Sequence, residues 1–150
     1  MDTKANPIQR PLFTSAKEAE AAFYEALAHA NLEAMMAVWS EDEEVLCIHP
    51  GGPRLQGLAA VREGWRELFD GNPRLDIRVM HGVTQNNIMV AVHSVLEFVG
   101  LRGDDQLHPP MIATNVYTRG ADGWRMVLHH ASPAPDERAL HSQDTPHIIH

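Results

Sequence analysis

Histidine is the residue type in this sequence that points most directly to chemistry, because the chain carries ten of them in 150 residues. His49 follows Cys47 by two positions in the apolar segment 45–49 (VLCIH), and a Cys–His pair is one form of activated nucleophile. Residues two apart in a strand stand side by side, however, so a small core cysteine is the favoured interpretation of Cys47. Because residues 50–53 (PGGP) end this strand, we expect His49 at the mouth of a pocket.

Two further histidines, His129 and His130, are adjacent in the segment 124–131 (WRMVLHHA). Neighbouring side chains of a strand point to opposite faces, so these two cannot bind one metal ion together. The face that carries Met126 and Leu128 also carries His130, which predicts that His130 faces the interior and His129 the outside. His130 is then a candidate for proton transfer, or else it satisfies a backbone carbonyl at the edge of the core.

Asn115 and Tyr117 share one face of the segment 111–118 (MIATNVYT). A buried asparagine needs partners for up to four hydrogen bonds. Asn115 is therefore either satisfied by the fold or placed to meet a ligand, and we expect Tyr117 beside it.

A histidine and a carboxylate, His93 and Glu97, lie four residues apart on the segment 88–99, which suggests acid–base chemistry. The favoured interpretation is a polar pair on the outer or dimer-facing surface. Trp65 follows the apolar spacing of a helix, so core packing is its first interpretation and a pocket wall its second.

The common signatures of cofactor and metal sites are missing from the sequence. No three histidines have zinc-site spacing, and the motifs HExxH, GxGxxG and GxSxG do not occur. The single cysteine, Cys47, excludes an internal disulfide and a cysteine-rich zinc site, and fits a reducing cytoplasm. We therefore expect no metal and no cofactor.

The elements that must position these side chains change from helical to extended along the chain. Ser15 and Glu18 form a capping box for a helix whose apolar residues recur every three or four positions through residue 30. A shorter helix runs through residues 32–39, and Gly57 opens a third. An arm of residues 1–14 precedes a single domain of residues 15–132, and a tail of residues 133–150 follows it.

Four strand candidates, residues 75–81, 88–99, 111–118 and 124–131, come after the short strand at 45–49. Short connections at 82–87, 100–110 and 119–123 predict antiparallel pairing and an α+β fold. The segment 88–99 has apolar residues at both its odd and its even positions, so both faces of this strand need to be covered by other parts of the protein. We expect a homodimer, in which a second copy of the chain covers the outer face of the sheet.

Charge and hydropathy limit the partners of this chain. Twelve Lys and Arg against twenty Asp and Glu give a net charge of −8, which argues against nucleic-acid binding. The N-terminal residues lack the apolar stretch of a secretory signal, and no apolar run reaches the ~18 residues that a membrane span needs. We expect a soluble, cytoplasmic protein with no membrane partner.

The order of elements and three motifs resemble one superfamily. The motifs are FYEALAHANLEAMMAVWSEDEEVLCIHPGGPRLQG, AAVREGW and ATNVYTRGADGWRMVLHHASPAP, within residues 16 to 135. They resemble the nuclear transport factor 2-like (NTF2-like) superfamily of SnoaL-like and ketosteroid-isomerase-like domains. The last motif is also similar to the association domain of calcium/calmodulin-dependent protein kinase II. The resemblance implies a cone-shaped fold, in which the N-terminal helices pack in a strongly curved, mostly antiparallel sheet around a pocket.

Matched residue by residue, the sequence departs from the family's catalytic patterns. Cys47 stands where ketosteroid isomerases have their general-base aspartate, Phe23 where they have a tyrosine, and Asn115 at or next to their oxyanion-binding acid. The arginines of the kinase association-domain pocket align with Asn115 and Ser94. The His–Asp dyad of the dehydratases has no clear match. His130 lies on the hairpin where that family has its histidine, but no acidic partner for it can be identified.

The sequence therefore predicts an apolar small-molecule pocket used for ligand binding or oligomerisation, with a small apolar, carboxylate or ketone ligand. The alternative is a cofactor-independent isomerase, cyclase, lyase or dehydratase. In that alternative His130 or His49 transfers the proton, and Asn115 and Tyr117 hold the substrate or its oxyanion. Cys47 and Trp65 complete the predicted site as its walls.

Overall fold

Three helices and six strands make up the part of the chain that the computed structural model describes, residues 10–71, 74–104 and 108–135. The order is that of the sequence analysis, with helices and short strands first and long strands afterwards. The helices are α1 (Ala16–Ala28), α2 (Leu32–Val38) and α3 (Leu58–Phe69). The strands are β1 (Leu46–Ile48), β2 (Arg54–Gln56), β3 (Leu75–Asn86), β4 (Val90–Leu101), β5 (Met111–Gly120) and β6 (Gly123–Pro133).

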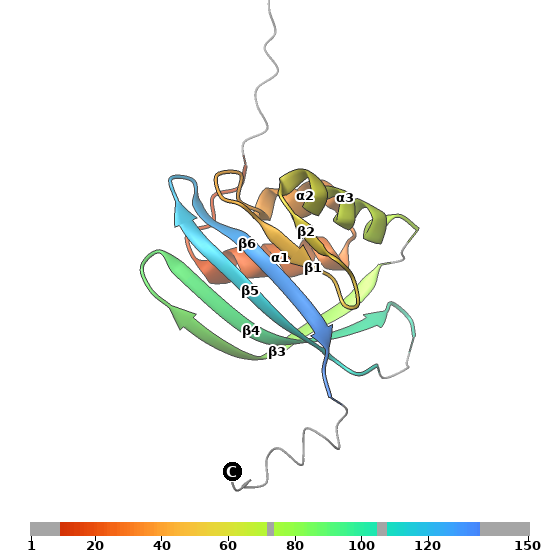
Figure 1. Cartoon of the computed structure of the whole chain (residues 1–150). Coiled ribbons are helices and arrows are strands. Elements are labelled where there is room, and N and C mark those ends of the chain that lie inside the picture. Colours follow the sequence, from red (N-terminus) through yellow and green to blue (C-terminus); the bar gives the residue numbers. More distant parts are fainter. Residues whose placement is uncertain (1–9, 72–73, 105–107, 136–150) are drawn as a thin grey trace, which may run out of the picture.

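The strands form one sheet in the order β2-β1-β6-β5-β4-β3. Consecutive strands from β3 to β6 pair antiparallel, as predicted, whereas β1 lies parallel to β6. The sheet curves around α1, which contacts β3, β5 and β6, and α2 and α3 lie near β1 and β2 at one end (Figure 1). The predicted α+β cone is confirmed.

One local prediction about the strands was wrong, and one short strand was missed. The segment 82–87 was expected to be a turn, but β3 continues through Asn86. A register shift between Met80 and Val83 accommodates one extra residue of β3, and pairing with β4 resumes at Val83 and Ser94. The short strand β2 was not predicted, and it is held by pairing with β1 on the other side of the PGGP turn.

The caps of α1 and α2 agree with the sequence. The Ser15 hydroxyl oxygen accepts from the Glu18 N–H at 3.1 Å, and the Glu18 carboxylate accepts from the Thr14 N–H at 2.7 Å. Asn31 begins α2 by accepting from the Ala34 N–H at 3.0 Å. Between the helices Ala30 adopts a left-handed backbone with φ 50°, which makes the sharp turn between α1 and α2.

The core lies between the helices and the inner face of the sheet. Trp39, Trp65 and Phe23 are at most 1% exposed, which confirms core packing as the interpretation of Trp65. Phe13, in the predicted arm, is also buried, and its carbonyl accepts from the Trp124 N–H at 2.9 Å. Residues 1–9 and 136–150, most of the predicted arm and tail, lie outside the described residues, and the boundaries at 15 and 132 stay predictions.

None of the helices in the described residues is long and apolar enough to cross a membrane.

Candidate functional site

A row of four buried polar side chains crosses the interior between α1 and the sheet. The Tyr24 hydroxyl donates to Glu97 Oε2 at 2.6 Å and accepts from Asn115 Nδ2 at 2.8 Å. Asn115 Oδ1 in turn lies 2.6 Å from His129 Nδ1. Since an amide oxygen can only accept, His129 carries its proton on Nδ1 and is left with a lone pair on Nε2.

The strand register brings these side chains to the inner face. His93 pairs with Asn115 across β4 and β5, and Asn115 pairs with His129 across β5 and β6. Paired residues point to the same face of a sheet, so all three side chains point toward α1. Each is at most 2% exposed.

His129, rather than His130, faces the interior, so the predicted orientation of this pair was wrong. β5 and β6 change register between Val116 and Tyr117: Val116 pairs with Leu128 and Tyr117 with Met126. Val127 is therefore an extra residue in β6. Such a β-bulge reverses which side chains of the following residues point inward and which point outward. His130 is exposed and faces away from the interior.

The outer-surface interpretation of His93 and Glu97 was also wrong, because they are only 1% and 4% exposed. They face α1, where His93 Nδ1 contacts a carboxylate oxygen of Glu20 and Glu97 accepts from Tyr24. Glu20 and Tyr24 lie one helical turn apart on the same side of α1. The sequence analysis did not identify Glu20 or Tyr24 as site residues. The available signal was the matching spacing: Glu20 and Tyr24 are four residues apart in α1, as His93 and Glu97 are in β4.

Tyr117 lies on the inner face, as predicted, where its ring packs against His93. The ring centroids of Tyr117 and His93 are 5.0 Å apart. Neither the Tyr117 hydroxyl nor His93 Nε2 has a hydrogen-bond partner among the described residues, and both atoms are buried. A partner for them has to come from outside the described protein atoms or after a rearrangement.

The pKa values in the row are shifted mainly by burial. Burial raises the pKa of Glu97, against the Tyr24 hydroxyl that lowers it, and burial together with the Glu97 charge raises the pKa of Tyr24. The pKa of Tyr117 is raised in the same way, with contributions from Glu20 and Glu97. Burial, with the nearby His49 and His130, lowers the pKa of His129 to about 3, so this imidazole is neutral at physiological pH.

A cleft of about 430 Å³ runs between α1 and the strands β3 and β4. This volume is within the ~300–1,000 Å³ typical of small-molecule sites. Its walls combine charged, polar and apolar side chains, and it meets the polar row at Tyr24. The lining residues are Lys17, Glu20, Ala21 and Tyr24 of α1, Val79, Gly82 and Thr84 of β3, and His93 and Val95 of β4.

The predicted residues Cys47, His49 and Trp65 come together elsewhere, between β1 and α3. The Cys47 sulfur lies 3.8 Å from His49 Nε2, and the His49 and Trp65 rings meet edge to face at 4.5 Å. Burial raises the pKa of Cys47 to about 12 and lowers that of His49. A neutral thiol is a poor nucleophile, so this geometry favours the packing interpretation of Cys47.

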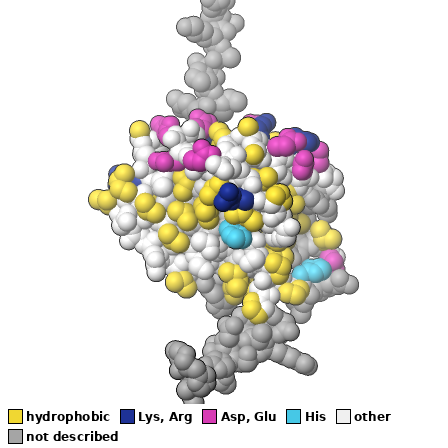
Figure 2. Space-filling view, in the orientation of Figure 1, with side chains coloured by type: hydrophobic (Ala, Val, Ile, Leu, Met, Phe, Trp, Pro, Cys, Tyr) yellow, Lys and Arg dark blue, Asp and Glu magenta, His cyan; other side chains and the backbone are white. Residues whose placement is uncertain are grey.

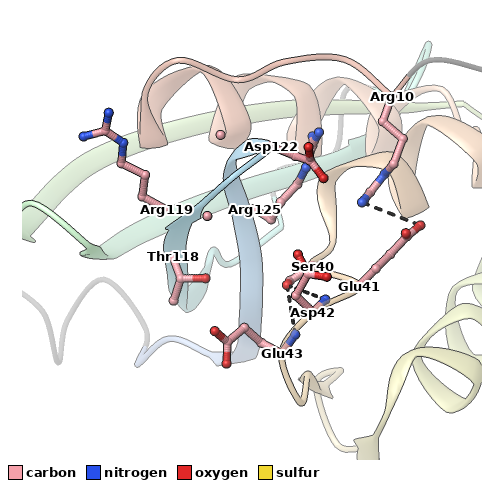
Figure 3. Close-up of a pocket in the computed structure, with 11 residues that line it drawn as sticks. Arg10, Ser40, Glu41, Asp42, Glu43, Thr118, Arg119, Asp122 and Arg125 are labelled. Atoms are coloured by element: carbon pink, nitrogen blue, oxygen red, sulfur yellow. Dashed lines mark hydrogen bonds and ion pairs between the residues drawn. The ribbon is translucent and has the colours of Figure 1, made fainter.

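A smaller hollow, about 40 Å³, lies where the 40–43 segment meets the β5–β6 turn (Figure 3). Its arginines hold the end of α2: Arg125 donates to the Ala37 carbonyl at 3.0 Å and Arg10 at 3.1 Å. Arg10 also lies 3.6 Å from Glu41. This hollow has room for only about three waters, so we assign it a structural role.

Within the described residues, no three His, Cys, Asp or Glu side chains gather as ligands for a metal ion.

Comparisons with known proteins agree with the fold. A 43% identical protein from Thiobacillus denitrificans, a candidate calcium/calmodulin-dependent protein kinase type II association domain, superposes with a TM-score of 0.73 over 83% of this chain and 99% of its own. A candidate dehydratase of the NTF2-like family from Streptomyces avermitilis is 26% identical, with a TM-score of 0.71 over 79% of this chain and 92% of its own.

Among curated proteins, the F-box protein SKIP8 of Arabidopsis thaliana is 26% identical over 110 residues, which are 73% of this chain. The match spans 46% of that protein, so the chain corresponds to less than half of its curated relative. The family model of the SnoaL-like domain matches residues 16–137. The chain therefore belongs to the SnoaL-like domain family of the NTF2-like superfamily.

Proposed function

We propose that this chain is a small-molecule-binding domain and that its ligand occupies the cleft between α1 and strands β3 and β4. The observation that carries the proposal is the polar wall of this cleft. Tyr24 and the Glu20–His93 contact line a space of about 430 Å³, and Tyr24 is held in place by Glu97 and Asn115. Pockets that combine apolar walls with a few fixed polar groups are the usual form of ligand sites.

Of the residues predicted to bind a ligand, none lines this cleft. Asn115 supports it through Tyr24, and Tyr117 lies beside His93. We assign Cys47, His49 and Trp65 to the packing between β1 and α3, and His130 to the outer face. In this proposal the ligand contacts move to Glu20, Tyr24 and His93.

The binding test is a library of small carboxylates and cyclic ketones, followed by 1H–15N NMR of the whole chain. Hits should shift the amides of Ala21, Gly82 and Thr84. Ala21→Trp places a large side chain on the exposed wall of the cleft and should abolish these shifts. Ala59→Trp, at an exposed alanine of α3 outside the cleft, is the matched control and should keep them. The absence of any cleft-directed hit across the library would contradict the proposal.

A second candidate is proton-transfer catalysis of the isomerase or dehydratase type, and the Glu20–His93 contact favours it. A carboxylate that accepts from His93 Nδ1 leaves Nε2 to take a proton from a substrate carbon and to return it, which requires no cofactor. However, Nε2 is buried, so a side chain must move before the substrate meets it. This requirement is why we rank binding above catalysis.

Exchange of the α-protons of bound cyclic ketones for solvent deuterium tests the second candidate. His93→Gln should slow the exchange by about 10²-fold or more, and His130→Gln should leave it unchanged. A wild-type rate equal to that in buffer would exclude proton transfer on this class of ketones.

The partner that we propose is a second copy of this chain, docked on the outer face of the sheet. Figure 2 shows hydrophobic side chains gathered across the face in view, with acidic ones along the top. The outward residues of β4 and β5 include Leu96, Phe98, Ile112 and Val116. The name of the Thiobacillus protein, an association domain, supports assembly as well. The single cysteine suits the reducing cytoplasm, where we place the protein.

A further inference from the structure

The cleft has two ends, which the contacts between α1 and β4 define. At one end of the cleft, Glu20 of α1 contacts His93 of β4. One helical turn further along α1, Tyr24 contacts Glu97, which lies four residues further along β4. The two elements therefore run in the same direction along the cleft. Lys17, one turn before Glu20, falls at the end that begins β4.

Strand β3 runs antiparallel to β4, so its residues line the cleft in the opposite chain order. Thr84 pairs with His93, and Val79 pairs with Glu97. One end of the cleft is thus formed by Lys17, Thr84 and the Glu20–His93 contact, and we call it the cationic end. The other, the apolar end, is formed by Val79 and Tyr24, with Val95 between the two.

The positive charge at the cationic end is not used inside the protein. Lys17 is exposed, and no carboxylate of the described residues lies within ion-pair distance of its ammonium group. Of the two acids that follow Lys17 in α1, Glu18 accepts from the Thr14 N–H and Glu20, one turn along, is engaged by His93. In a chain with a net charge of −8, an unpaired lysine at a cleft attracts an anion locally where the overall charge repels it.

The other end offers little polarity to a ligand. The Tyr24 hydroxyl already donates to Glu97 and accepts from Asn115, so what it presents to the cleft is mainly the ring. Val79 and Val95 add aliphatic surface. An uncharged, apolar group loses no hydrogen bonds when it enters here, whereas a charged group would be desolvated without a partner.

We infer that the cleft takes a small amphiphilic carboxylate, with the carboxylate at Lys17 and Thr84 and an apolar body toward Val79, Val95 and the Tyr24 ring. This inference rests on the proposed function and names its ligand class. It also orients the ligand, because the two ends differ in charge.

Three probes of equal length test the charge: octanoate, octanamide and octan-1-ol, titrated into the full chain by NMR. Octanoate should bind at least fivefold more tightly than octanamide. Lys17→Gln should remove this preference without weakening octanamide. The control is Arg119→Gln, which removes another exposed cation that lies outside the cleft, and it should leave the preference intact.

The apolar end is tested by Val79→Asn with octanoate and butyrate. The substitution should weaken octanoate several-fold and leave the shorter butyrate nearly unchanged, because only the longer chain reaches Val79. Equal affinity of octanoate and octanamide, or a preference that survives Lys17→Gln, would overturn the inference and leave the proposed function standing. If all three eight-carbon probes fail while other library members shift cleft amides, the ligand class is wrong. If the whole library fails, the proposed function itself is contradicted.

Discussion

His129 and Asn115 face each other across β5 and β6, with 2.6 Å between His129 Nδ1 and Asn115 Oδ1, and both side chains are at most 2% exposed. This contact joins the last strand to the row that ends on Glu97. Because Asn115 also donates to Tyr24, one amide fixes the proton position on the histidine and the orientation of the tyrosine.

Asn115→Ala should lower the free energy of unfolding by about 3 kcal/mol, because it leaves Tyr24 and His129 each without one buried partner and opens a small cavity. Urea unfolding followed by circular dichroism measures the change. Thr114→Ala, at the neighbouring outward position, should cost less than about 1 kcal/mol. Equal losses for the two variants would show that the row adds nothing beyond ordinary packing.

Stability should fall in mild acid because of His129. Its pKa is about 3 in the folded chain, against 6.5 for a solvated histidine, so the unfolded chain binds the extra proton between these values. The contribution is complete above pH 6.5 and is lost as the pH falls toward 3, at up to about 1.4 kcal/mol per pH unit. Glu97, whose pKa is raised, acts in the opposite direction: its contribution is present at low pH and is lost as the pH rises through its folded pKa.

The comparison of His129→Gln with His130→Gln isolates this effect, since Glu97 is common to both variants. Urea midpoints at pH 7.5, 6.0 and 5.0 should show a flatter pH profile for His129→Gln than for the wild type. The exposed His130 should be replaceable without changing the slope. Parallel profiles for both variants would rule out His129 as the source.

Cys47 should be unreactive in the folded protein. It is fully buried, and its pKa of about 12 keeps the thiol protonated at pH 8. A thiol assay with Ellman's reagent should therefore count close to zero thiols in buffer and one after addition of urea, because the chain has a single cysteine. Rapid labelling of the native protein would reopen the nucleophile interpretation of Cys47 and His49.

Ala30→Gly should stabilise the fold by about 0.5–1 kcal/mol. Ala30 sits at φ 50°, a conformation that costs an alanine more than a glycine. Ala28→Gly, inside the last turn of α1, is the control and should destabilise by about 1 kcal/mol, since glycine disfavours a helix. The opposite sign of the two shifts in the urea midpoint is the result to look for.

Sedimentation equilibrium should give a dimer mass for the wild type. Leu96→Glu places a charge in the middle of the outer face of β4 and should shift the protein to monomer. Leu68→Glu, at a partly exposed leucine of α3, should remain dimeric. A monomeric wild type, or dissociation by both variants alike, would refute the proposed interface.

The sequence by itself determined the class of this fold and most of its elements. Apolar spacing located α1 and α3, the Ser15–Glu18 cap began α1 where it was expected, and the long strands followed at period two. These are local properties, fixed by backbone sterics and by which side chains tolerate water, so a window of about ten residues contains them.

The inner face of the sheet was decided by tertiary structure. One extra residue, Val127, reversed which of His129 and His130 is buried, and such a bulge depends on pairing with β5 rather than on any residue type in β6. Likewise, His93 and Glu97 look like surface residues in the sequence, because nothing local shows that Glu20 and Tyr24 of α1 lie against them. Periodicity gives two faces for each strand, and only the long-range contact selects which one becomes the site.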